Sequence, residues 1–157
     1  MDHGELIDVY VSGIDSIIPA LSGLSPEQLR ARPVAGSWSI LENVCHLADS
    51  EALFAERMKR VLSENRPAML VSNPDDCVAT LAYHEREAAE EIALMELLRR
   101  QIGHILVTLP EEAWQRVGIH SVDGEKTLEQ LVQKAVDHLE HHLKFMRDKR
   151  QMIEGNA

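Results

Sequence analysis

Aromatic residues, glycine and proline are all scarce in this sequence. Phe, Trp and Tyr together make up 4% of the 157 residues, beside 8 glycines and 6 prolines. A fold of many short strands needs β-branched and aromatic residues within its strands and frequent turn residues between them. The composition therefore argues against an all-β protein.

Cysteine is also rare, because Cys45 and Cys77 are the two in the sequence. They form no C-x-x-C motif, and two cysteines cannot supply the disulfide framework that is typical of small secreted domains. We expect both thiols to behave as small buried apolar side chains.

Long apolar runs and an excess of positive charge are missing. No stretch approaches the ~20 apolar residues that span a bilayer, and the acidic start, residues 1–5, lacks the basic and apolar regions of a signal peptide. The 16 Lys and Arg against 26 Asp and Glu give a formal net charge of -10, which opposes binding to nucleic acid and to anionic membranes. We therefore expect a soluble, cytoplasmic protein that binds neither.

The length and composition fit one globular domain over residues 1–157. Hydrophobic residues make up 45% of the chain and charged residues 27%, which is ordinary for a folded domain. A chain of this length buries roughly 70% of the surface that its unfolded form exposes. We see no internal repeat, low-complexity tract or linker that would divide it.

Apolar residues at helical spacing predict four long helices. Two of them begin at capping boxes, Ser39–Glu42 and Thr127–Gln130, where the hydroxyl accepts a hydrogen bond from an unpaired backbone N–H. Proline and neighbouring polar residues mark the end of the helix over 39–63 and both ends of the helix over 74–109. The four expected ranges are 5–21, 39–63, 74–109 and 127–150.

Four amphipathic helices with short connections predict an all-α fold, a four-helix bundle. We expect the helices to pack antiparallel. The links over 66–74 and 22–38 are long enough for a crossover connection, so the pattern leaves the helix order open. Residues 117–126, which contain Asp123-Gly124, predict a loop or a small hairpin.

Eight histidines are the most unusual feature of the sequence, and three of them lie close together in the last helix. His138 and His142 are one helical turn apart and fall on its apolar face, so both imidazoles could bind one cation. His141 falls on the solvated face. Two inward histidines could instead be hydrogen-bonded core residues, and the pattern by itself leaves both interpretations open.

His46, Asp49 and His84 are further candidates. His46 lies off the main apolar stripe of the helix over 39–63, which is typical of a boundary residue. Asp49 follows one turn later and could orient an imidazole or bind a metal directly. His84 falls on the apolar stripe of the range 74–109, so it could line a site, although a structural core histidine fits the pattern as well.

The order of these motifs resembles the DinB-like superfamily, a group also described as metal-dependent hydrolases. The similarity rests on W-S-I-L-E-N-V-C-H-L-A-D-S-E over 38–51, on T-L-E-Q-L-V over 127–132, and on H-L-E-H-H over 138–142. It spans most of the chain, from the first expected helix to the last.

The resemblance implies a four-helix bundle with a crossover connection, often a homodimer, that holds a divalent metal with three histidines. Matched motif by motif, the ligands are His46, His138 and His142, and His141 is a neighbour that does not bind. Zinc is our first expectation because imidazole suits it, with nickel, iron and manganese as alternatives. Several members of the group are transferases or isomerases that use low-molecular-weight thiols.

These inferences lead to a functional hypothesis with alternatives. A three-histidine site leaves a coordination position open, which is typical of catalytic zinc, so water or a small thiol could be activated there to attack a small-molecule substrate. Asp49, and also His84, could orient a ligand or move a proton. The alternatives are a non-catalytic helical binding module with a vestigial site, and a structural metal that joins two helices.

Overall fold

The computed structural model describes residues 1–155. Most of this part of the chain is helical, and its strands are short. The helices are α1 (His3–Ser12), α2 (Ile17–Leu21), α3 (Pro26–Arg30), α4 (Ile40–Ser63), α5 (Pro74–Thr80), α6 (Ala88–Leu106) and α7 (Leu128–Gly155). The 3-10 turns are η1 (Gly13–Ser16), η2 (Tyr83–Glu85) and η3 (Glu111–Gln115). The strands are β1 (Ala68–Met69), β2 (Val117–His120) and β3 (Gly124–Thr127).

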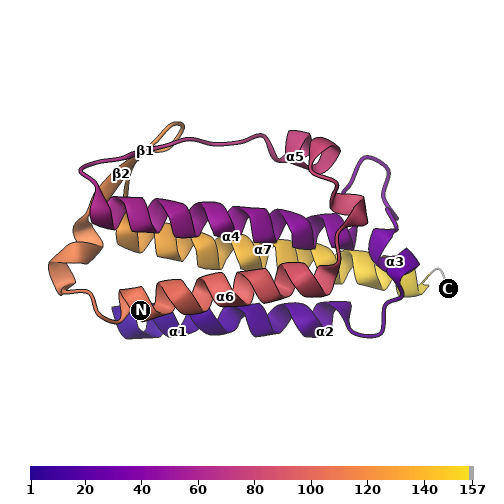
Figure 1. The fold of residues 1–157 in the computed structure, drawn as a ribbon. Coiled ribbons are helices and arrows are strands. Elements are labelled where there is room, and N and C mark those ends of the chain that lie inside the picture. The colour runs from indigo at the N-terminus through magenta and orange to yellow at the C-terminus, as the bar shows by residue number, and fades with distance from the viewer. Residues whose placement is uncertain (156–157) are drawn as a thin grey trace.

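Four helical rods, α1 with α2, α4, α6 and α7, form a bundle within residues 1–155 (Figure 1). Helix α4 packs against α6 and α7, and α1 packs against the same two helices. The apolar stripes that the sequence predicts meet in the centre of this arrangement, because each helix has one apolar face to bury. The prediction of a four-helix bundle is confirmed.

A crossover connection sets the directions of the rods. The chain leaves α4 at one end of the bundle, runs along its outside through β1 and α5, and enters α6 at the other end (Figure 1). Consequently α4 and α6 run parallel, as do α1 and α7, whereas α4 and α7 run antiparallel. The crossover over 66–74 that the sequence permitted is present, so the antiparallel packing expected for the helices holds for α4 with α7 but not for α4 with α6 or α1 with α7.

A small sheet covers the end of the bundle where α4 stops. Residues 117–126, for which the sequence left a loop or a small hairpin open, form the hairpin of β2 and β3, and Gly124 begins β3 at φ +72°. Strand β1 pairs parallel with β2 and was not predicted, because it is only two residues long. The hairpin leads directly into α7, which begins at Leu128.

The expected third helix, 74–109, is broken into α5, η2 and α6. Ala82 adopts the left-handed region at φ +55° and turns the chain. The break brings the Tyr83 side chain, which is fully buried, into a small apolar cluster with Leu41 and Cys45. Tertiary packing of this aromatic ring therefore overrides a periodicity that would continue the helix.

Two further helix boundaries differ from the prediction. A 3-10 turn separates α1 from α2, because the ring of Pro19 cannot be accommodated in a continuous α-helix without distorting the preceding turn. Helix α7 continues to Gly155 rather than ending near Arg150. Its last turns are held by Arg150, whose guanidinium donates to Glu154 and to the carbonyl of Pro19.

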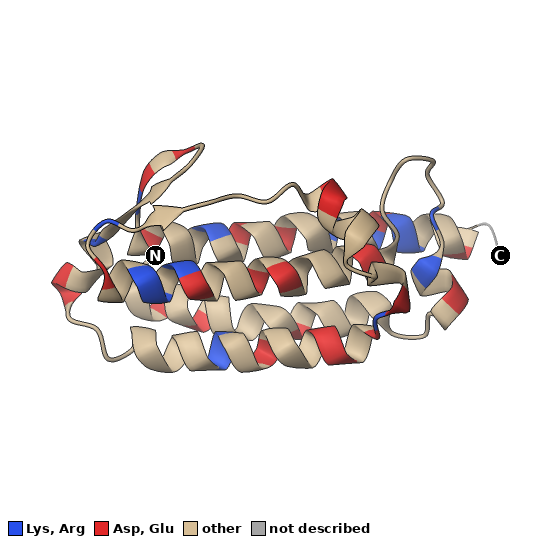
Figure 2. Ribbon diagram, turned by 45° about the horizontal axis from the view of Figure 1, so that its top comes forward, with Lys and Arg blue, Asp and Glu red and all other residues tan. Residues whose placement is uncertain are grey.

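Acidic and basic residues are interspersed along the helices (Figure 2). Of the two cysteines, Cys45 is buried as expected and Cys77 is partly exposed. No helix within residues 1–155 combines the length and the apolar character that crossing a bilayer requires.

Candidate metal centre

Three histidines from two antiparallel helices meet inside the bundle. His46 comes from the middle of α4, and His138 and His142 come from successive turns of α7. One ring nitrogen from each lies within 4.8 Å of the others, and the Nε2 atoms of His46 and His138 are 3.1 Å apart. Two nitrogens at ~2.0–2.1 Å from one tetrahedral ion lie about 3.4 Å apart, so the spacing fits a shared metal.

The surroundings keep these imidazoles neutral. Burial, and after it the neighbouring histidines, lower the pKa of His138 and of His142 to about 3. Burial also lowers the pKa of His46, although the Asp49 carboxylate opposes this shift. A neutral imidazole has a free lone pair, so the donor set is in the form that binds a metal ion at neutral pH.

Asn43 fixes the orientation of His142. Its Oδ1 accepts from Nδ1 of His142 at 2.9 Å, and its own Nδ2 donates to the Ser39 carbonyl at 2.7 Å. With Nδ1 occupied as a donor, the lone pair of His142 is on Nε2, toward the other two histidines. Asn43 is buried, and the sequence analysis missed its role. In the sequence, this role was indicated only by the position of Asn43, one turn before His46 on the same flank of the helix.

We predict that Asn43→Ala weakens metal binding without unfolding the bundle. The His142 ring would lose its hydrogen-bond partner and the fixed tautomer, and loss of such a supporting contact typically costs 10–100-fold in metal affinity. Competition titration with a chromogenic zinc chelator measures the change in Kd. The control is Ser50→Ala, which removes only a 3.4 Å contact to His46. Equal zinc affinity in Asn43→Ala and the unchanged chain would contradict this role.

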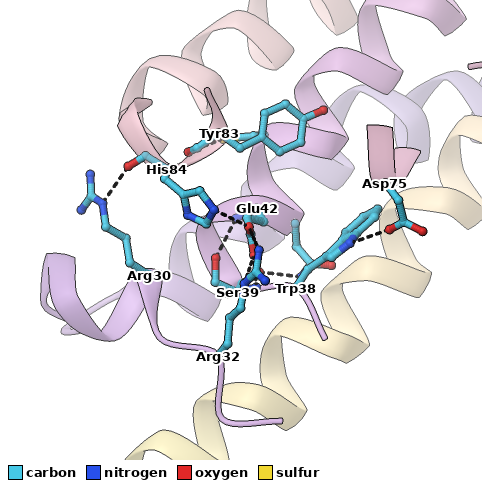
Figure 3. A network of polar contacts seen from close by, with 10 residues as sticks. Arg30, Arg32, Trp38, Ser39, Glu42, Asp75, Tyr83 and His84 are labelled. Atoms are coloured by element: carbon cyan, nitrogen blue, oxygen red, sulfur yellow. Dashed lines mark hydrogen bonds and ion pairs between the residues drawn. The ribbon is translucent and has the colours of Figure 1, made fainter. Parts of the chain in front are cut away.

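Aromatic rings enclose the three histidines. The Trp38 ring lies 5.0 Å from His46 and is nearly parallel to that of His142, and the Phe54 ring contacts His138 edge-on at 5.7 Å. The indole N–H of Trp38 donates to Asp75 at the start of α5, so the crossover segment holds this ring in place (Figure 3). The cluster therefore borders apolar ring surface contributed by Trp38 and Phe54.

His84 does not join the cluster. Its Nε2 lies 3.0 Å from a Glu42 carboxylate oxygen, and its side chain is half exposed (Figure 3). Arg32 also binds Glu42, whose carboxylate caps the backbone N–H of Ser39. Burial favours the neutral acid, but the hydrogen bonds from Arg32 and Ser39 hold the pKa of Glu42 below its usual value. We expect His84 to stabilise the start of α4, and we leave it out of the proposed chemistry.

Asp49 lines a cleft of about 270 Å³ beside His46 and His138. Its carboxylate accepts hydrogen bonds from the Tyr83 hydroxyl and from Arg86, both at 2.8 Å. Burial and the bond to Asp49 raise the pKa of Tyr83, so its hydroxyl stays protonated and donates. Tyr83 and Arg86, which the sequence analysis did not identify, come from the segment that breaks the expected third helix.

The structure thus places the predicted ligands together and separates the two predicted catalytic residues. Asp49 lies in the cleft next to the cluster, whereas His84 contacts Glu42 instead. That the three histidines bind a metal stays a prediction. His141 is exposed, as expected, and its ring contacts His142 from outside at 5.4 Å.

The sequence is similar to a known protein family and to individual relatives. A family profile described as "DinB superfamily" matches residues 12–146. A protein of Oceanobacillus iheyensis with the name "Putative metal-dependent hydrolase OB0413" is 26% identical over 137 residues, which cover 87% of this chain and 77% of that relative.

Solved structures share the fold. One, described as "YfiT from Bacillus subtilis is a probable metal-dependent hydrolase with an unusual four-helix bundle topology", aligns with a TM-score of 0.89 at 23% identity and covers 95% of this chain and 86% of that chain. Another, "Crystal structure of the mycothiol-dependent maleylpyruvate isomerase", aligns with a TM-score of 0.72 at 13% identity, over 92% of this chain and 60% of that one. At these identities the likeness concerns the fold.

Proposed function

Because the chain belongs to the DinB superfamily, we propose that it is a metal-dependent enzyme whose divalent ion is held by His46, His138 and His142. The observation that carries the proposal is the convergence of three neutral ring nitrogens within 4.8 Å inside the bundle. Zinc is the ion we favour, because imidazole suits it and three-histidine sites with an open position are typical of catalytic zinc.

The cleft beside the cluster supports a reaction on a small molecule. When bound, a divalent ion supplies Lewis acidity that lowers the pKa of water or of a small thiol. The Asp49 carboxylate, which Tyr83 and Arg86 hold in the same cleft, accepts the proton that the nucleophile loses. Phe54 and Trp38 place apolar rings beside the cluster, and the lower local polarity strengthens the electrostatic interactions there.

Hydrolysis and thiol transfer are the two reaction types that fit this arrangement. The name of the Oceanobacillus relative favours hydrolysis. The fold shared with a mycothiol-dependent isomerase favours a low-molecular-weight thiol as nucleophile. Both types need the same features of this chain, namely three imidazole ligands, an open coordination position and a proton acceptor in the cleft.

A test that needs no knowledge of the substrate is to load the protein with Co²⁺ and titrate it with azide and with 2-mercaptoethanol. We expect both to change the visible spectrum, and the thiol to add a sulfur-to-cobalt charge-transfer band, because an open position exchanges ligands. Asp49→Asn should keep the cobalt and the response to azide. It should lower turnover of a nitrophenyl ester, or of chlorodinitrobenzene with the thiol, by about 10²–10⁴-fold.

A cobalt spectrum that responds to neither ligand would contradict the catalytic proposal. It would indicate a closed coordination shell and favour a structural metal that joins α4 to α7, in a helical module without catalysis. The protein for this test is prepared without a nickel column, so that the metal content reflects the cobalt added.

A further inference from the structure

A second cleft borders the histidine cluster from another side. Its volume is about 340 Å³, which is within the range of small-molecule pockets. Ser37, Trp38, Phe145 and Lys149 contribute to its walls, and His142 connects it to the cluster. The cleft beside Asp49 touches the cluster through His46 and His138 instead, and the two clefts share no lining residue.

Lys149 is the feature of this second cleft that packing alone does not explain. Its residue is only 7% exposed, yet within residues 1–155 its ammonium group forms no hydrogen bond to the protein and no ion pair. Its Nζ atom lies over the ring of Phe145, 5.4 Å from the ring centroid. A lysine residue with so little exposed surface normally pairs with an acid. Here the buried part is the side-chain stem, and the ammonium group at its end is left without a protein partner in this part of the chain.

The acidic groups that could neutralise Lys149 are occupied elsewhere. Asp148, its neighbour in sequence, pairs with Lys144 on the outer face of α7. Glu42, the buried carboxylate at the start of α4, is bound by Arg32 and His84. Within residues 1–155, no side-chain nitrogen or oxygen that is shut off from solvent lacks a hydrogen-bond partner. The ammonium group of Lys149 therefore reaches the open space of the cleft.

The remaining walls indicate what kind of anion fits. Trp38 and Phe145 supply aromatic surface, and Ser37 supplies a polar residue at the rim. One ammonium group matches one negative charge, so a monoanionic carboxylate suits the cleft better than a phosphate dianion does. A compact acid with an apolar or aromatic body would place that body against the rings while its carboxylate meets Lys149.

We propose that this cleft binds the carboxylate of a small, partly apolar acid, with Lys149 as the charge partner, next to the metal ligand His142. The assignment rests on the proposed function, which it deepens by giving the substrate of the enzyme a chemical class. The part of the substrate that reacts lies toward the cluster, and the carboxylate fixes its orientation from the opposite end.

The test measures binding of benzoate by NMR titration, with benzamide and phenyl phosphate as matched probes, to zinc-loaded and to metal-free protein. We expect benzoate to bind the unchanged chain at least fivefold more tightly than benzamide and more tightly than phenyl phosphate. Lys149→Met should weaken benzoate binding about tenfold and leave benzamide unchanged, and Lys149→Arg should restore most of the loss. The control Lys144→Met removes an equal charge from the exposed face of α7.

The assignment would be wrong if benzoate showed no saturable binding, or if benzamide or phenyl phosphate bound more tightly than benzoate. It would also be wrong if Lys149→Met left the affinity for benzoate unchanged, or if Lys144→Met lowered that affinity equally. The metal-free arm separates this inference from the proposed function. A Lys149-dependent difference that persists without metal supports the subsite even if the protein binds no zinc. If the cobalt-loaded protein responds to azide and to the thiol, but Lys149→Met does not change benzoate binding by the zinc-loaded protein, the proposed function stands and the subsite is removed.

Discussion

His138→Ala is expected to abolish metal binding, from close to one divalent ion per chain to below about one in ten. Removing one of three ligands leaves two imidazoles, fewer protein ligands than stable zinc sites have. The substitution should also remove the stabilisation that zinc gives the unchanged chain, which is about 4 kcal/mol when free zinc is 1,000 times its Kd. Elemental analysis after dialysis, on protein prepared without a nickel column, and thermal unfolding with and without zinc measure both effects.

His141→Ala is the matched control for that experiment. His141 is next to the site in sequence, is exposed on α7, and touches His142 only through ring contact. It should therefore keep the metal and the zinc-dependent rise in Tm. If both alanine variants lost the metal equally, or if the unchanged chain held far less than one ion, the three-histidine centre would be wrong.

Arg99→Met is expected to lower the free energy of unfolding by about 3–5 kcal/mol, because it leaves a buried carboxylate without its cation. Arg99 is 2% exposed, and its Nε donates to Glu51 at 2.9 Å. Its other nitrogens donate to the backbone carbonyls of Tyr10 and Ala135, so one side chain connects α1, α4, α6 and α7. The Tyr10 hydroxyl donates to the same carboxylate at 2.5 Å.

Urea unfolding measures this loss of stability, and two further variants serve as controls. Lys144→Met breaks the exposed pair with Asp148, where the side chains are 76% and 47% exposed, and should change the free energy of unfolding by less than about 1 kcal/mol. Combining Arg99→Met with Glu51→Leu and Tyr10→Phe should recover much of the stability, because no charge is then left unpaired. A loss below 1 kcal/mol in Arg99→Met would show that Glu51 is satisfied without it.

Local sequence signals determined where the helices lie along the chain better than they determined how the helices pack together. The capping boxes at Ser39 and Thr127 fixed the starts of α4 and α7, because the hydrogen bonds that begin a helix lie within four residues of each other. The one-turn spacing of His138 and His142 likewise follows from the helix itself. Asp123-Gly124 indicated a loop or a small hairpin, and the structure has the hairpin.

The burial of the residues at the site depends on contacts between distant helices, which no local sequence pattern predicts. By periodicity His46 was a boundary residue, and the structure does leave it only partly buried. The family resemblance implied that it is a ligand, and the structure gives the physical reason. Helix α7 runs antiparallel to α4 and brings the Nε2 atom of His138 to 3.1 Å from that of His46. Phe145, which periodicity assigned to the apolar face of α7, is 42% exposed because it lies at the rim of the second cleft.

The sequence by itself determined the helices, their inward faces and the pair of histidines on α7, since hydrogen bonding and side-chain spacing along one helix are local. Only the tertiary structure decided the parallel course of α4 and α6, the break at Ala82, the partners of Arg99 and the position of Lys149 in the second cleft. Those choices depend on which faces of distant segments bury each other. The free energy gained by burying those faces is summed over the whole core, so no single stretch of the chain encodes it.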